Sequence, residues 1–70
     1  MIPLALSNIG EEIIIKRIGG SPDVKKHLED IGFVVGGNIT IITSLNGNVI
    51  VNVKGSRIAI SQEMAKKIMV

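Results

Sequence analysis

The chain contains no cysteine, and this absence removes several chemistries together. A protein without thiols has no disulfide, no thiolate metal ligand and no cysteine nucleophile. The absence fits a reducing cytosol, and the opening MIPLALS lacks the basic segment and the length of a signal peptide. We therefore expect a cytoplasmic protein.

Aromatic residues and long apolar segments are equally scarce. Phe33 is the only aromatic residue, so the stacking platform that many single-strand nucleic-acid binders use is missing. Hydrophobic residues make up 46% of the chain, yet no apolar run approaches the ~20 residues that a membrane span needs. We expect no direct insertion into a membrane.

The residues that carry catalysis are also few. His27 is the only histidine, and no serine stands with it in a nucleophile motif. The glycine pairs do not follow phosphate-loop spacing, since Gly36–Gly37 precedes an expected strand rather than a helix. The chain is therefore predicted not to be an enzyme, with no catalytic residues and no cofactor.

A metal site has equally few candidate ligands. Within a helix His27, Glu29 and Asp30 do not share a face, so they form a poor ligand set. Asp23, His27 and Asp30 share a face better, which leaves a weak divalent site as the alternative to a solvated helix face. Hard and borderline divalent ions need several convergent oxygen or imidazole ligands. We predict no dedicated metal site.

The charged residues are balanced rather than concentrated. Eight basic and six acidic side chains give a formal net charge of +2. Opposed pairs follow one another along the chain, with Glu11–Glu12 before Lys16–Arg17 and Lys25–Lys26 before Glu29–Asp30. A nucleic-acid reader usually gathers basic charge on one face. This distribution favours an ordinary solvated surface and no nucleic-acid partner.

Isoleucine and valine recur throughout the chain and predict a mainly β fold, because branching at Cβ restricts χ1 and favours extended backbone. Seventy residues allow one small domain, which we take to span 1–70. The segment EEIIIKRI, Glu11 to Ile18, predicts a first strand, which ends at Gly19–Gly20.

The next segment, SPDVKKHLEDIG, predicts a helix with signals at both ends. Ser21 is a suitable N-cap, and Gly32 can supply the left-handed stop after the last turn. Val24, Leu28 and Ile31 recur at helical spacing and form one apolar stripe.

Two further strands, Asn38–Ser44 and Asn48–Lys54, flank Asn46–Gly47, a strong hairpin signal. A two-residue loop would pair Ser44 with Val49 and mix apolar with polar positions. A three-residue loop, Leu45 to Gly47, places one apolar set on one face, so we predict this loop, with Gly47 left-handed in a bulge. The predicted pairs are Thr43 with Val49, Ile41 with Val51, and Ile39 with Val53.

In this register Ile42 and Ile50 pair on the outward face of the hairpin. Two interpretations stay open for this pair. Either the helix covers both side chains, or they form an exposed apolar spot for a partner.

The stretch VKGSRIAIS predicts a second hairpin, with Gly55–Ser56 as a type II′ turn. Lys54 then lies opposite Arg57, Val53 opposite Ile58, and Val51 opposite Ile60. Like charges that face each other are mildly destabilising. The basic pair is therefore either a solvated hairpin tip or the docking point for an anionic group of a partner.

The last segment, SQEMAKKIMV, predicts one or two helical turns that Ser61 caps and that bury Met64, Ala65 and Ile68. A short strand, Ile68 to Val70, follows. Several short strands, tight turns and a sheet edge that must be closed favour a partly open barrel. We expect about five strands, one helix after the first strand and a short helical turn before the last.

Taken in order, these residues resemble the ferrous iron transport protein A (FeoA) family. The segments that carry the resemblance are HLEDIGFVVGGNITII and NVIVNVKGSRIAISQEMAKKIMV, and the opening Pro3–Glu12 is also similar. The matching positions are mostly structural glycines and apolar residues: Leu28, Gly32, Gly36, Gly55, Arg57, Ile58, Ala59, Ile60, Ser61, Ala65, Ile68 and Val70.

The resemblance implies an SH3-like small barrel and a cytosolic accessory role in bacterial ferrous iron uptake. It further implies action on the large membrane transporter FeoB, which carries a cytosolic GTP-binding domain. The alternatives are a small nucleic-acid-binding barrel and a free-standing relative of the C-terminal domain of iron-dependent repressors. The expected partner surface consists of Lys54, Arg57, Ile42 and Ile50, and weak homo-oligomer formation stays open.

Overall fold

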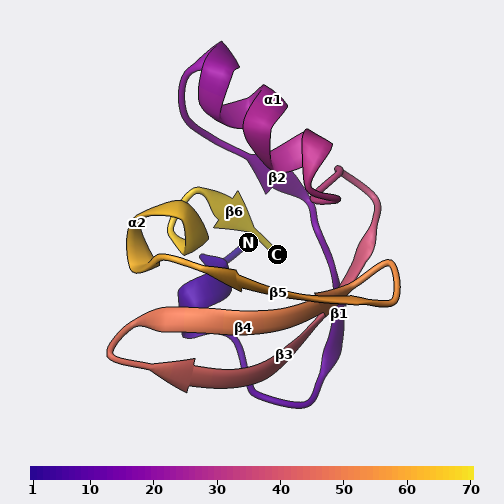
Figure 1. Cartoon of the computed structure of the whole chain (residues 1–70), viewed down its shortest axis with the longest axis vertical. Helices are drawn as coiled ribbons and strands as arrows, with labels where there is room; N and C mark the ends of the chain where they lie inside the picture. Colours follow the sequence, from indigo (N-terminus) through magenta and orange to yellow (C-terminus); the bar gives the residue numbers. More distant parts are fainter.

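The computed structural model describes all residues, 1–70, and contains six short strands, two α-helices and one 3₁₀ helix (Figure 1). Four strands form one antiparallel sheet in the order β1-β3-β4-β5, and the other two, β2 and β6, form a second small sheet. None of the helices has the length and apolar character needed to cross a membrane. The elements are η1 Leu4–Leu6, β1 Glu12–Ile14, β2 Arg17–Ile18, α1 Pro22–Asp30, β3 Asn38–Leu45, β4 Asn48–Val53, β5 Ser56–Ile60, α2 Gln62–Ala65 and β6 Ile68–Met69.

The core is entirely apolar and draws on both sheets and all three helices. Phe33, the one aromatic residue, is fully buried in it. The remaining core members are aliphatic, in agreement with the composition: Leu4, Ile15, Ile18, Leu28, Ile39, Ile41, Val49, Val51, Val53, Ile60, Ala65 and Ile68.

The predicted first strand is divided between the two sheets. β1 pairs with β3, whereas β2 pairs with β6. The chain changes partner at Ile15 and Lys16: the Ile15 N–H donates to the Gly37 carbonyl at 2.9 Å, and the Lys16 N–H donates to the Met69 carbonyl at 2.8 Å. One continuous segment therefore contributes a strand to each of the two sheets. Because the single predicted strand is observed as two, the fold has six strands where about five were expected.

Both predicted helices are confirmed. The Ser21 hydroxyl accepts from the Val24 N–H at 3.3 Å at the start of α1, and Gly32 has a φ of 114° after its end. The Ser61 hydroxyl accepts from the Met64 N–H at 3.3 Å at the start of α2. The final strand is one residue shorter than predicted, because Val70 pairs through its backbone with Ile2 instead.

The loop of the β3–β4 hairpin differs from the prediction. It has two residues, Asn46 and Gly47, whose φ angles of 54° and 84° are typical of a type I′ turn. Leu45 pairs with Asn48, so the predicted three-residue loop is wrong. The I′ turn is favoured because its twist matches that of the flanking strands.

A β-bulge reconciles this tight turn with the apolar pattern of the strands. The register shifts between Ile41 and Thr43, so Ile42 is an extra residue without a partner. Gly47 is left-handed as predicted, but the bulge lies here and not beside it. The pairs Ile41–Val51 and Ile39–Val53 are confirmed, while Thr43 pairs with Ile50 and Ser44 with Val49.

The β4–β5 hairpin also turns at a different place. Its loop is Lys54–Gly55, with φ angles of 52° and 78°, rather than Gly55–Ser56. The predicted pairs are therefore wrong, since the observed register aligns Val53 with Ser56, Asn52 with Arg57, Val51 with Ile58, and Val49 with Ile60. The predicted register would have left Val49 without an apolar partner. Because the difference is two residues, the same side chains still face the core.

Candidate functional site

The basic residues predicted to meet a partner lie at the β4–β5 hairpin tip, but they do not face each other. Lys54 is in the turn itself, and Arg57 is opposite Asn52 on β5. Both side chains are exposed. They are therefore not a directly opposed cross-strand pair, and the tip carries two exposed cations.

The isoleucines predicted to share the outward face do not pair either. Ile42 is the bulged residue of β3, whereas Ile50 lies between Thr43 on β3 and Ala59 on β5. Both are half-buried. Helix α1 lies beyond β2, away from the middle of β3 and β4 (Figure 1), so the interpretation in which it covers this pair is wrong.

The candidate metal ligands on α1 remain dispersed. Asp23, His27 and Asp30 are all exposed. Nowhere in the chain do three or more His, Asp or Glu side chains form a group that could hold a metal ion.

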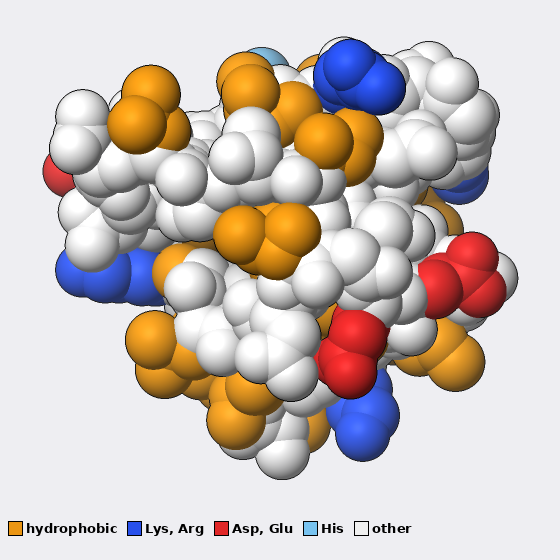
Figure 2. All heavy atoms as spheres, turned by 90° about the horizontal axis from the view of Figure 1, so that it is seen from below, with side chains coloured by type: hydrophobic (Ala, Val, Ile, Leu, Met, Phe, Trp, Pro, Cys, Tyr) orange, Lys and Arg blue, Asp and Glu red, His pale blue; other side chains and the backbone are white.

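Exposed apolar side chains, by contrast, concentrate in one segment of the chain. Four of the seven large hydrophobic residues that are exposed lie in the first nine positions: Met1, Ile2, Leu6 and Ile9. On the face of the molecule opposite α1, apolar side chains lie between isolated acidic and basic ones (Figure 2). Exposed apolar side chains that gather in one region are a common mark of an interaction site.

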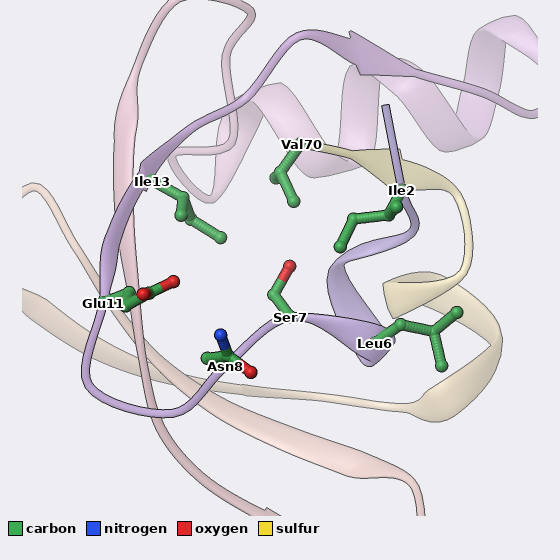
Figure 3. A pocket seen from close by; sticks show the side chains of 7 residues that line it. All are labelled: Ile2, Leu6, Ser7, Asn8, Glu11, Ile13 and Val70. Carbon is green, nitrogen blue, oxygen red and sulfur yellow. The ribbon is translucent and has the colours of Figure 1, made fainter.

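A pocket of about 320 Å³ opens in this region (Figure 3). It is the only pocket in the molecule. Its walls come from both ends of the sequence and from β1: Ile2, Leu6, Ser7, Asn8, Glu11, Ile13 and Val70.

Backbone hydrogen bonds hold these walls in place. Ile2 and Val70 exchange two of them, with N···O distances of 3.0 and 2.8 Å. The short helix η1 ends with the Ser7 N–H donating to the Leu4 carbonyl at 3.0 Å, and the Leu4 side chain is fully buried in the core. The Gly10 N–H donates to the Ile41 carbonyl at 2.8 Å, which fixes the loop before β1 to the main sheet.

The Ser7 hydroxyl is the unusual feature of the pocket. Its oxygen is buried and has no hydrogen-bond partner. In Figure 3 it points into the pocket, where the side chains of Ile2, Ile13 and Val70 converge on it. A buried polar group without a partner costs about 1–3 kcal/mol of stability, so an occupant that satisfies it gains a corresponding advantage.

Glu11 is the only charged residue that lines the pocket. Its carboxylate is directed toward the pocket in Figure 3, beside the amide of Asn8. No basic side chain lies in the lining to balance it. The pocket thus offers an apolar interior, one hydroxyl able both to donate and to accept, and one anion at its edge.

Sequence reasoning missed this site because its residues are far apart along the chain. The available signal was the apolar opening MIPLALSNI, whose Ile2, Leu6 and Ile9 have no counterpart in a predicted strand or helix. That Val70 and Ile13 complete the pocket depends on the pairing of the two chain ends, which no local pattern indicates.

Solved structures of known proteins share this architecture. The architecture is that of an SH3-like small barrel: FeoA of Stenotrophomonas maltophilia, crystallised with zinc and described as a procaryotic SH3 domain protein, superposes with a TM-score of 0.84. It is 17% identical, and the match covers 100% of this chain and 89% of that one. A crystal structure of the iron uptake regulatory protein FeoA superposes with a TM-score of 0.89 at 30% identity, covering 99% and 92% of the two chains.

The model of the FeoA domain matches residues 2–70, and the chain belongs to this family. A curated protein of Methanocaldococcus jannaschii named "Putative Fe(2+) transport protein A" is 41% identical over 70 residues, which cover 100% of this chain and 85% of that relative. The same fold forms part of a manganese-dependent transcriptional repressor, with a TM-score of 0.85 and 16% identity over 94% of this chain and 38% of that one.

Proposed function

We propose that the protein is a cytosolic, non-enzymatic accessory protein of ferrous iron uptake that acts on the cytosolic GTP-binding part of a FeoB-type membrane transporter. The observation that carries this proposal is membership of the FeoA family over residues 2–70 together with 41% identity to a protein named for Fe(2+) transport. The exposed apolar side chains at the start of the chain, of which Ile2 and Leu6 line the pocket, support a role in protein binding, because exposed apolar patches commonly mark interaction sites.

The test is binding of the purified protein to the purified cytosolic part of the transporter. We expect a saturable complex in a pull-down and in calorimetry. The rival nucleic-acid function predicts instead that RNA or DNA binds at low salt and is released as salt rises, with a log–log slope set by the number of contacted phosphates. Binding of nucleic acid without binding of the transporter would overturn the proposal.

A second expectation concerns the transported ion. The accessory role requires no resident iron, and the chain offers one histidine and dispersed carboxylates. Anaerobic calorimetry with Fe²⁺ should show no stoichiometric site tighter than about 1 μM. A tight one-to-one isotherm that His27→Ala abolishes would contradict this expectation.

A further inference from the structure

We propose that the pocket beside η1 docks an extended segment of the transporter's cytosolic part in which an aliphatic side chain is followed directly by Lys or Arg. This inference rests on the proposed function, and it assigns to the docking surface a position and a recognition chemistry. Three independent features of the pocket define the occupant.

The first feature is the apolar lining. Ile2, Ile13 and Val70 converge on the interior (Figure 3), and the volume of about 320 Å³ lies at the lower end of the range for ligand pockets. This space suits one branched aliphatic side chain with the backbone that carries it. Leu6 lines the pocket yet is 72% exposed, and Met1 and Ile9, which flank the lining residues in the sequence, are exposed too, which favours a polypeptide over a compact small molecule.

The second feature is the unpartnered Ser7 hydroxyl. The oxygen has almost no surface accessible to solvent in this structure, so an occupant reaches it only when neighbouring side chains move apart; a backbone amide or carbonyl would then satisfy it, whereas a purely apolar occupant would leave it without a hydrogen bond. An extended segment has free backbone groups beside each inserted side chain, while a helix uses its own internally. The hydroxyl therefore favours an extended occupant.

The third feature is the Glu11 carboxylate at the edge. It is the only charge in the lining and it is directed toward the pocket (Figure 3). A cationic side chain next to the inserted aliphatic residue would complement it, and an acidic one would be rejected. The charge thus selects Lys or Arg at the neighbouring position.

The binding experiment uses a matched pair of leucines. Leu6 is 72% exposed at the pocket, and Leu45 is 70% exposed near the β3–β4 hairpin tip. Both Leu6→Asp and Leu45→Asp should fold normally, because neither side chain is in the core. We expect Leu6→Asp to weaken binding to the transporter's cytosolic part at least about tenfold, and Leu45→Asp to change it less than about twofold. Equal effects of the two variants would overturn the pocket and leave the proposed function standing.

A peptide titration tests the pocket without the transporter. The probes are two blocked tetrapeptides, acetyl-Gly-Leu-Arg-Gly-amide and acetyl-Gly-Leu-Glu-Gly-amide, followed by heteronuclear NMR of the labelled protein. We expect the arginine peptide alone to give saturable shifts at the amides of Ser7, Glu11 and Val70. Absence of such shifts would overturn the pocket chemistry, whether or not the transporter binds.

Charge reversal provides the specificity test. Glu11 lines the pocket, and its neighbour Glu12 is exposed on β1 outside it. Glu11→Lys should exchange the preference so that the glutamate peptide binds better, whereas Glu12→Lys, with the same change in net charge, should keep the preference for arginine. Identical behaviour of the two variants would show that only overall charge matters and would overturn the assignment of Glu11.

The remaining outcomes also decide the proposal. If the wild type does not bind the transporter, the proposed function fails, and the peptide titration alone decides whether the pocket recognises this chemistry. If ultracentrifugation shows self-association that Leu6→Asp abolishes, and the arginine peptide does not compete with it, the occupant is a second copy and the proposal is overturned.

Discussion

The two hairpin tips have the same turn geometry but different surroundings. Asn46–Gly47 and Lys54–Gly55 are both two-residue loops with positive φ at each position. The first tip contacts α2: a Cβ built on Gly47 would lie 2.7 Å from the Gln62 side chain, and the Asn48 side-chain oxygen accepts from the Gln62 N–H at 3.1 Å. The second tip is open at its glycine, with nothing within 4 Å of the corresponding position on Gly55.

This difference separates a structural turn from one that is available to a partner. The β3–β4 tip contacts α2, and α2 leads directly into β6 (Figure 1), so this contact helps to hold the last segment of the chain against the main sheet. The β4–β5 tip has only a loose contact with the rest of the molecule: the Lys54 side chain lies 3.9 Å from a Cβ built on Gly32, just after α1. It also places a lysine at a φ of 52°, where asparagine or glycine would be more favourable. A residue that conflicts with its local conformation is a candidate for a functional role.

The largest effect is expected from Gly47→Ala. Alanine is unfavourable at a backbone φ of 84°, and its methyl group would also displace the Gln62 side chain. We therefore expect the free energy of unfolding to fall by about 2 kcal/mol. Gly55→Ala introduces the same unfavourable backbone conformation without a clash, so it should lower the free energy of unfolding by about 1 kcal/mol. Urea denaturation measures both.

A double-mutant cycle isolates the contact from the strain. In a Gln62→Ala background, the cost of Gly47→Ala should fall to that of Gly55→Ala. If the two glycines already cost the same in the wild type, the Gln62 side chain moves aside without cost and the contrast between the tips is lost.

These tips also show how far the sequence alone could predict the structure. Alternation of apolar residues predicted which side chains of β3, β4 and β5 face the core, and the caps predicted both helices. The length of the β3–β4 loop was wrong because the apolar pattern and the turn chemistry favour different registers there, whereas the β4–β5 loop had the predicted two residues but was placed one residue too late. The bulge at Ile42 satisfies both, and no feature of the pattern marks where an unpaired residue will lie.

The candidate site was less predictable than the fold. Lys54 and Arg57 are correctly placed at an exposed tip, yet their mutual position followed from the wrong turn. The pocket depends on the backbone pairing of Ile2 with Val70 and on an unsatisfied Ser7 hydroxyl. Both features result from tertiary packing, and tertiary packing cannot be predicted from the pattern of residues that are neighbours in the sequence.

An intermediate effect is expected from Asn48→Ala. This change removes the acceptor for the Gln62 N–H, which is one of the free N–H groups at the start of α2. We expect a loss of about 1 kcal/mol, since the bond is partly replaced by water at this exposed position. Asn52→Ala on the same strand, an exposed residue opposite Arg57, is the matched control and should cost less. Equal costs would mean that the bond to α2 contributes nothing.

A smaller effect of opposite sign is expected from Lys54→Asn. Asparagine tolerates a φ of 52° better than lysine, so the free energy of unfolding should rise by about 0.5 kcal/mol. For a domain of this size the melting temperature should rise by about 2–4 °C. The reverse exchange at the other tip, Asn46→Lys, should lower it by a similar amount. A melting temperature that falls in Lys54→Asn would show that the lysine stabilises the free protein and needs no functional explanation.

The smallest effect on stability, and the most informative one for function, is expected from Arg57→Glu. Because Arg57 lies opposite Asn52 and not Lys54, the substitution creates no attractive cross-strand pair, and stability should stay within about 0.5 kcal/mol of the wild type. If the β4–β5 tip docks on an acidic or phosphate-bearing surface, affinity for the transporter's cytosolic part should fall about tenfold through loss of a charge-assisted contact. We expect this fall. Lys25→Glu on α1 changes the net charge equally and is the control, because a general loss of electrostatic steering would weaken both variants alike. If Arg57→Glu binds as well as the wild type, the tip is a solvated turn, and docking is left to the pocket at the other region of the molecule.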